Sequence, residues 1–173
     1  MAANSETAGG MPEANLARQV EPLQTHANWV QTLRAATAEV FSMMVGVEVV
    51  VPETSDCPVH SYVTGVLGIT GAVNAVLTLR CSQQSAGKIA SRMLGISAEE
   101  AMEHQCDAIG EICNMIAGHF KHKIGLSDKC ALTIPSVVTG GNYHIHSLAA
   151  GERFEFPVLY DGDPLWLALE TRK

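Results

Sequence analysis

The chain has 173 residues, 47% of them hydrophobic, which is enough for one folded domain with its own core and too short for two of ordinary size. Its formal net charge of −7 argues against nucleic acid or an anionic membrane as the main partner, because both attract basic surfaces. No uninterrupted apolar run approaches the roughly 20 residues that a membrane-spanning helix needs.

The cysteines indicate a reducing compartment. They are five in number, widely spaced and without a C-x-x-C pair, which predicts free thiols rather than a disulfide framework. The N-terminal residues have neither the basic start nor the apolar stretch of a signal peptide. We therefore expect a soluble, cytoplasmic protein. The cysteines are Cys57, Cys81, Cys106, Cys113 and Cys130.

The chain is expected to start with a tail. Residues 1–24 are poor in large apolar side chains and predict a flexible segment, so that one folded domain covers 25–173. From 26–45 apolar residues recur at helical spacing, and Gly46 follows as a helix stop. The β-branched stretch 47–51 predicts a strand.

The middle of the chain predicts two strands followed by two helices. The strands cover about 61–69 and 73–80. Ser82 can cap a helix that extends over 83–94. The strongest helix signal is the capping box S-A-E-E, from which a helical pattern continues over 97–124.

The last part of the chain predicts strands only, at about 130–138, 143–149, 153–160 and 165–170. Strands that arrive in hairpin-like clusters, separated by helices, indicate an α+β domain. Its sheet should be largely antiparallel and packed against long helices.

The helix predicted over 97–124 has two distinct faces. At about 100° per residue its apolar side chains form a stripe that should face the core. Glu111 then lies about 180° from the stripe, Gly118 about 160° and Asn114 about 120°. A glycine inside a helix costs about 1 kcal/mol relative to alanine, and close approach of another molecule's backbone would explain it. The stripe consists of Met102, Cys106, Ile109, Cys113, Ile116 and Phe120.

Part of this helix matches an earlier segment of the chain. Residues 38–46 align with 110–118, so that Glu39 takes the place of Glu111 and Ser42 the place of Asn114. This predicts a degenerate internal duplication, in which only the second copy keeps the carboxamide.

The run 107–118, D-A-I-G-E-I-C-N-M-I-A-G, resembles the E-x-x-N signature helix of the CheC/CheX/FliY phosphatases. Segments 65–79 and 134–140 resemble the strands before and after that helix in CheX-like domains, so the resemblance extends in order over about 26–170. CheC-like members carry two motifs and CheX-like members one, and a single complete motif fits the CheX pattern. His119 stands where asparagine is more usual.

The resemblance implies a CheX-like fold and hydrolysis of the aspartyl phosphate of a phosphorylated CheY-like response regulator. Asn114 is expected to orient the attacking water, because its amide can both donate and accept a hydrogen bond. Glu111 is expected to dock a receiver lysine, since an ordinary glutamate is a weak base at neutral pH. Asp107, Met115 and Gly118 are expected to contact the partner.

The resemblance further implies that this chain binds no cofactor, that magnesium sits on the receiver's carboxylates, and that the protein is a homodimer. One alternative is a module that binds a receiver without hydrolysing its phosphate. The intact pair of carboxylate and carboxamide favours the phosphatase, because simple docking does not need the carboxamide.

Two other patterns carry less weight. The series Gly65, Gly68, Gly71 has no following helix start or GK[ST], which argues against a nucleotide site. His144 and His146 alternate on a predicted strand but have no evident third ligand, so a metal-dependent enzyme is the weakest alternative.

Overall fold

The computed structural model describes residues 28–52, 61–141, 143 and 151–172. Its centre is a six-stranded sheet in the order β3-β1-β2-β6-β5, with β4 also paired to β1, and every pairing is antiparallel. This confirms the predicted α+β class. The strands are β1 (Val63–Gly71), β2 (Ala75–Cys81), β3 (Cys130–Leu132), β4 (Ser136–Thr139), β5 (Arg153–Tyr160) and β6 (Asp163–Thr171).

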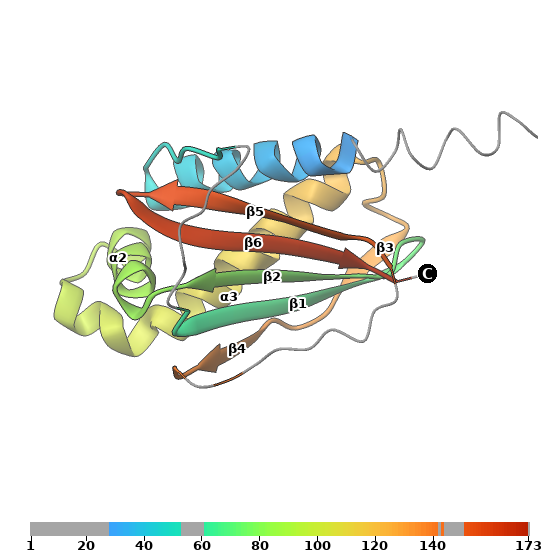
Figure 1. Cartoon of the computed structure of the whole chain (residues 1–173). Helices are drawn as coiled ribbons and strands as arrows, with labels where there is room; N and C mark the ends of the chain where they lie inside the picture. The colour runs from blue at the N-terminus through green and yellow to red at the C-terminus, as the bar shows by residue number, and fades with distance from the viewer. Residues whose placement is uncertain (1–27, 53–60, 142, 144–150, 173) are drawn as a thin grey trace, which may run out of the picture.

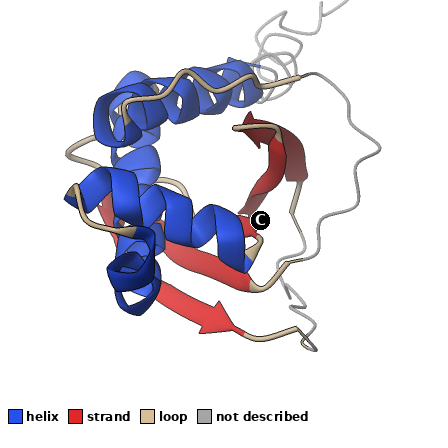
Figure 2. Cartoon of the chain, turned by 90° about the vertical axis from the view of Figure 1, so that its left-hand side faces the viewer, coloured by secondary structure: helices blue, strands red, loops and turns tan. Residues whose placement is uncertain are grey.

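The helices lie on one side of this curved sheet (Figures 1 and 2). An N-terminal helix over 28–40 continues into a π-helical turn, η1 (Phe41–Val45), and ends at Gly46, whose left-handed backbone (φ 68°) suits glycine. Helix α2 (Gln83–Leu94) follows β2, and α3 (Ala98–Lys123) crosses behind the sheet. The described residues contain no helix that is both long and apolar enough to cross a bilayer.

Helix α3 begins where its sequence predicts. The Ser97 hydroxyl accepts a hydrogen bond from the Glu100 backbone N–H (3.3 Å), and the Glu100 carboxylate accepts one from the Ser97 N–H (3.1 Å). Both bonds satisfy donors that a helix start leaves free. Lys121, His122 and Lys123 occupy the last turn, where positive charge complements the helix dipole.

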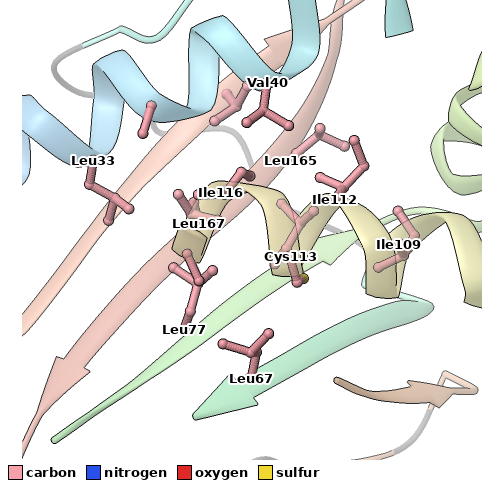
Figure 3. Close-up of a cluster of buried hydrophobic side chains, with 14 of the residues drawn as sticks. Leu33, Val40, Leu67, Leu77, Ile109, Ile112, Cys113, Ile116, Leu165 and Leu167 are labelled. Carbon is pink, nitrogen blue, oxygen red and sulfur yellow. The ribbon is translucent and has the colours of Figure 1, made fainter. Parts of the chain in front are cut away.

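The core lies between α3, the N-terminal helix and the sheet (Figure 3). Every second residue of β2 is buried, as expected of a strand with one face on the core. From α3 the core receives Ile109, Cys113, Ile116 and Phe120, which confirms the last four residues of the predicted stripe. Facing them are Leu67 and Leu77 from the sheet's first two strands, Leu165 and Leu167 from β6, and Leu33 and Val40 from the N-terminal helix.

The prediction is wrong for the first two residues of the stripe. Met102 is 37% exposed and Cys106 is only half-buried, whereas Ala101 and Ala108 are buried against Ala90 of α2. The first turns of α3 pack on α2 rather than on the sheet, so their buried face has a different direction.

Two strand predictions also need correction. Residues 47–51 form no strand, and only Val50 makes an isolated bridge, to Leu159 at the free edge of β5. The strand expected at 130–138 is divided into β3 and β4. The expected tail and all of 143–149 except residue 143 lie outside the described residues, and the internal duplication stays a prediction.

The division between β3 and β4 is a β-bulge. Ile69 of β1 pairs with Leu132, and Val66 pairs with Ser136. Between these pairings the three residues 133–135 lie opposite only two residues of β1. Such an insertion re-aims side chains and is common beside active sites.

Candidate active site

An open groove of about 460 Å³ lies between α3 and this bulge. It brings together three of the predicted site residues, Asp107, Glu111 and Asn114, all from one face of α3. Because neighbours three and four residues apart share a helix face, one wall of the groove follows directly from the sequence. The other wall is formed by Leu132, Thr133, Ile134 and Pro135, and Gly110 contributes to the floor.

The bulge is held firmly against the sheet. The Thr133 N–H donates to the Gly68 carbonyl (2.9 Å), and the Gly68 N–H donates to the Thr133 hydroxyl (2.8 Å). A Cβ atom on Gly68 would come within 2.9 Å of the Thr133 methyl group, so a side chain there would push the wall away. Close packing of β1 against the bulge therefore explains why residue 68 is a glycine.

Helix α3 also packs closely on β1, on the side of the helix away from the groove. A Cβ atom on Gly65 would lie 2.5 Å from the Cys113 sulfur and 3.0 Å from a methyl carbon of Ile109. Cys113 directly precedes Asn114 in the chain. The height of Asn114 above the sheet thus depends on the absence of a side chain at position 65.

The pair proposed for chemistry is available to a partner. Glu111 is exposed and Asn114 half-buried, and neither side chain has a hydrogen-bond or ion-pair partner among the described residues. Among the described residues, the groove lining contains two carboxylates, Asp107 and Glu111, and no basic residue. Its electrostatic character suits a cationic group of another molecule.

The matching residues of the first helix behave differently. Glu39 accepts a hydrogen bond from Lys123 (2.8 Å) and lies 3.6 Å from His119. The Lys123 contact holds the pKa of the Glu39 carboxyl below its usual value, although partial desolvation opposes the shift. Ser42 is exposed. The Glu39 carboxylate is therefore already paired with a basic residue of the same chain.

Met115 and Gly118, the other expected contact residues, do not line the groove. Met115 is half-buried and packs against the main core. Gly118 is half-buried, yet a Cβ atom there would meet nothing within 4 Å. No contact within the described chain accounts for this glycine, and its role toward a partner stays a prediction.

The described residues contain no group of three or more histidines, cysteines or acidic residues placed to hold a metal ion. His144 and His146 lie outside the described residues. The described cysteines are free thiols, and burial raises the pKa of Cys81 and Cys113 to about 12, so that both stay protonated at neutral pH.

The bulge wall of the groove was not predicted. The sequence pattern predicts a continuous strand over 130–138, and a continuous strand has no extra residue at 133–135. Pro135 was the available signal, because proline has no N–H for a sheet ladder and occurs in strands mainly at edges and bulges.

Comparison with known proteins places this groove within a family. A family model described as chemotaxis phosphatase CheX matches residues 63–159, a span that includes α3 and both groove walls. The CheY-P phosphatase CheX of Thermotoga maritima is 34% identical over 106 residues, which make up 60% of this chain and 68% of that protein.

Solved structures show the same fold. The chemotaxis protein CheX of Desulfovibrio desulfuricans superposes with a TM-score of 0.72 at 22% identity, covering 84% of this chain and 99% of that one. The CheX of Borrelia burgdorferi, solved as a CheX–CheY–BeF3–Mg²⁺ complex, gives 0.70 at 20% identity, covering 84% and 98%. FliY of Thermotoga maritima is more distant, with 0.59 at 18% identity, covering 83% and 86%.

Proposed function

The chain belongs to the CheX family of chemotaxis phosphatases, and we propose that it hydrolyses the aspartyl phosphate of a CheY-like response regulator. The observation that carries the proposal is the pair of Glu111 and Asn114, which has no partner among the described residues and lines a groove within the matched span. The Thermotoga relative is a CheY-P phosphatase, and the Borrelia relative forms a complex with CheY.

In the proposed reaction Asn114 positions a water molecule in line with the phosphorus. Its amide can donate to and accept from one water, and its side chain has no competing partner among the described residues. The water oxygen bonds to phosphorus as the bond to the receiver's aspartate oxygen breaks, which leaves the aspartate as a carboxylate, and both protons of the water leave with the phosphate. Because phosphoryl transfer has a loose transition state, positioning and charge stabilisation supply most of the catalysis.

Glu111 in this proposal binds a lysine beside the receiver's phosphorylated aspartate. Asp107, one turn earlier on the same face, adds negative charge to the groove. Met115 and Gly118 lie further along α3 and are proposed to contact the receiver, with Gly118 allowing a close approach. Magnesium belongs to the receiver and neutralises charge on its phosphate.

The decisive experiment follows phosphate loss from a magnesium-loaded phospho-receiver. We expect wild type to accelerate the decay well beyond autohydrolysis. Asn114→Ala should lower kcat by about 100-fold or more, as removal of a single positioning group in other active sites does. Ser42→Ala, at the matching position of the first helix, should keep full activity.

Binding of the same receiver to Asn114→Ala separates two functions. If the variant binds with unchanged Kd while its kcat collapses, the water-positioning role is supported. If wild type binds the receiver and leaves its decay at the autohydrolysis rate, the protein is a docking module instead. An Asn114→Ala variant with normal kcat would contradict the assignment of this residue.

A further inference from the structure

The bulge beside the groove presents an almost fully exposed isoleucine. The exposed fraction of Ile134 is 89%, against 62% for Val50, the next most exposed large hydrophobic residue among those described. Ile134 lines the same groove as Glu111 and Asn114. A single exposed apolar residue is ordinary, but one on the wall of a polar groove suits contact with another molecule.

The backbone around Ile134 is fixed on both sides. Thr133 makes two hydrogen bonds with Gly68, and β3 and β4 pair with β1 before and after the bulge. Pro135 lies close to Gly110 of α3, at 3.6 Å from a Cβ atom built on that glycine. An anchored segment loses little conformational freedom when it binds, so its contacts are favourable for affinity.

The bulge also sets the direction of this side chain. Because 133–135 place three residues opposite two of β1, the alternation of the ladder is broken there. Without the extra residue, the strand would continue its alternation past this point. The fold thus places an apolar wall opposite the carboxylates of Asp107 and Glu111.

We propose that Ile134 and Pro135 form an apolar lip that packs against the receiver next to the lysine bound by Glu111. The inference rests on the proposed function and names a further part of its docking surface. The receiver is the occupant because the lip is continuous with the groove that must receive the phosphorylated site. Protein interfaces typically combine an apolar core that becomes buried on binding with a polar, solvent-accessible rim. The lip supplies affinity and takes no part in the chemistry.

Ile134→Ala tests the lip, with Val50→Ala as its matched control. Both are exposed β-branched residues, but Val50 bridges to β5, at the opposite edge of the sheet from β3 and β4. We expect Ile134→Ala to raise KM for the phospho-receiver by about 5-fold or more, because truncation of an interface residue that carries binding energy costs at least that factor in affinity. The kcat of the variant should stay unchanged. Val50→Ala should change neither constant.

Binding can also be measured directly, with a receiver that carries a phosphate analogue and is not hydrolysed. The Kd of each variant is measured for a receiver loaded with beryllofluoride and Mg²⁺, the state present in the Borrelia complex. Ile134→Ala should weaken this binding by the same factor as it raises KM. Equal melting temperatures of wild type and variant would show that the lip acts on binding rather than on folding.

The failures of the two proposals are distinguishable. If wild type accelerates decay and Ile134→Ala has unchanged KM and Kd, the lip is overturned and the phosphatase stands. If Ile134→Ala lowers kcat instead, the residue positions the chemistry and the inference is wrong. A change in self-association without a change in Kd would assign the lip to a second copy of the chain and would equally overturn it.

Discussion

The two glutamates of the matching helix segments differ in what surrounds them. Glu39 is bound by Lys123 and lies near His119, whereas Glu111 has no partner among the described residues. A carboxylate already paired with a lysine has little to offer another molecule. A free carboxylate on a groove whose described lining has no basic residue can form a strong charged hydrogen bond with an incoming lysine.

We expect Glu111→Gln to raise KM for the phospho-receiver by about 10- to 100-fold, because a hydrogen bond between charged groups contributes about 1.5–3 kcal/mol. The kcat of the variant should fall far less than that of Asn114→Ala. Steady-state kinetics with Glu39→Gln as the matched control measure both constants. A double-mutant cycle with the receiver lysine should show coupling, and strictly additive effects would contradict the pairing.

Helix α3 carries Glu111 and Asn114 of the candidate site, and its contact with β1 determines where these residues lie. The Cys113 sulfur and a methyl group of Ile109 occupy the space above Gly65. Protein interiors are close-packed, so an added methyl group must displace the helix or the strand. Stability and activity are therefore linked at Gly65, although this residue lies outside the groove lining.

Gly65→Ala is expected to lower the free energy of unfolding by about 1–3 kcal/mol, the usual cost of overpacking a core. It should also lower kcat, because the backbone that holds Asn114 moves. Gly118→Ala is the control of opposite sign: its Cβ atom meets nothing, and alanine favours a helix by up to about 1 kcal/mol.

Chemical denaturation and phosphatase assays on the two glycine variants check this expectation. A Gly65→Ala variant as stable as wild type would contradict the close contact. If Gly118→Ala is more stable but binds the receiver less tightly, the expected close approach of the partner at that glycine is supported.

The net charge of the whole molecule has the same sign as the charge of the groove, so both attract a basic partner. The chain carries a formal charge of −7, and two of its exposed carboxylates line the groove, where the described residues include no basic one. Such a field attracts a basic patch on a partner and is screened by salt over a Debye length of about 10 Å at 0.1 M. Charge is therefore expected to act on association rather than on the chemical step.

Raising NaCl from about 0.05 to 0.5 M should increase KM several-fold and leave kcat nearly unchanged, because salt screens exposed charges. The same titration with Glu111→Gln should show a shallower dependence, since one of the attracting charges is gone. Receiver autohydrolysis measured at each salt concentration is the control. A KM that does not depend on salt would contradict electrostatic docking.

The homodimer implied by the family stays a prediction, which light scattering after size exclusion would check.

Much of the fold and half of the site could be predicted from the sequence, because the signals are local. A capping box starts α3, helical periodicity buries Ile109, Ile116 and Phe120, and the same period leaves Glu111 and Asn114 on the other face. Caps and periodicity act within a few residues of the chain, so they need no knowledge of distant partners.

The other half of the site depends on contacts between residues far apart in the sequence. The bulge exists because Thr133 bonds to Gly68, 65 residues earlier, and no local pattern specifies that register. Residues 47–51 had the composition of a strand but pair only at Val50. Met102 lies against Gly87 of α2 and outside the main core, because α2 and not the sheet covers the start of α3. Helical periodicity alone was enough to place Glu111 and Asn114 on the face of α3 away from the core. What lies opposite them could not be predicted in this way, because strand pairing and helix packing depend on long-range contacts.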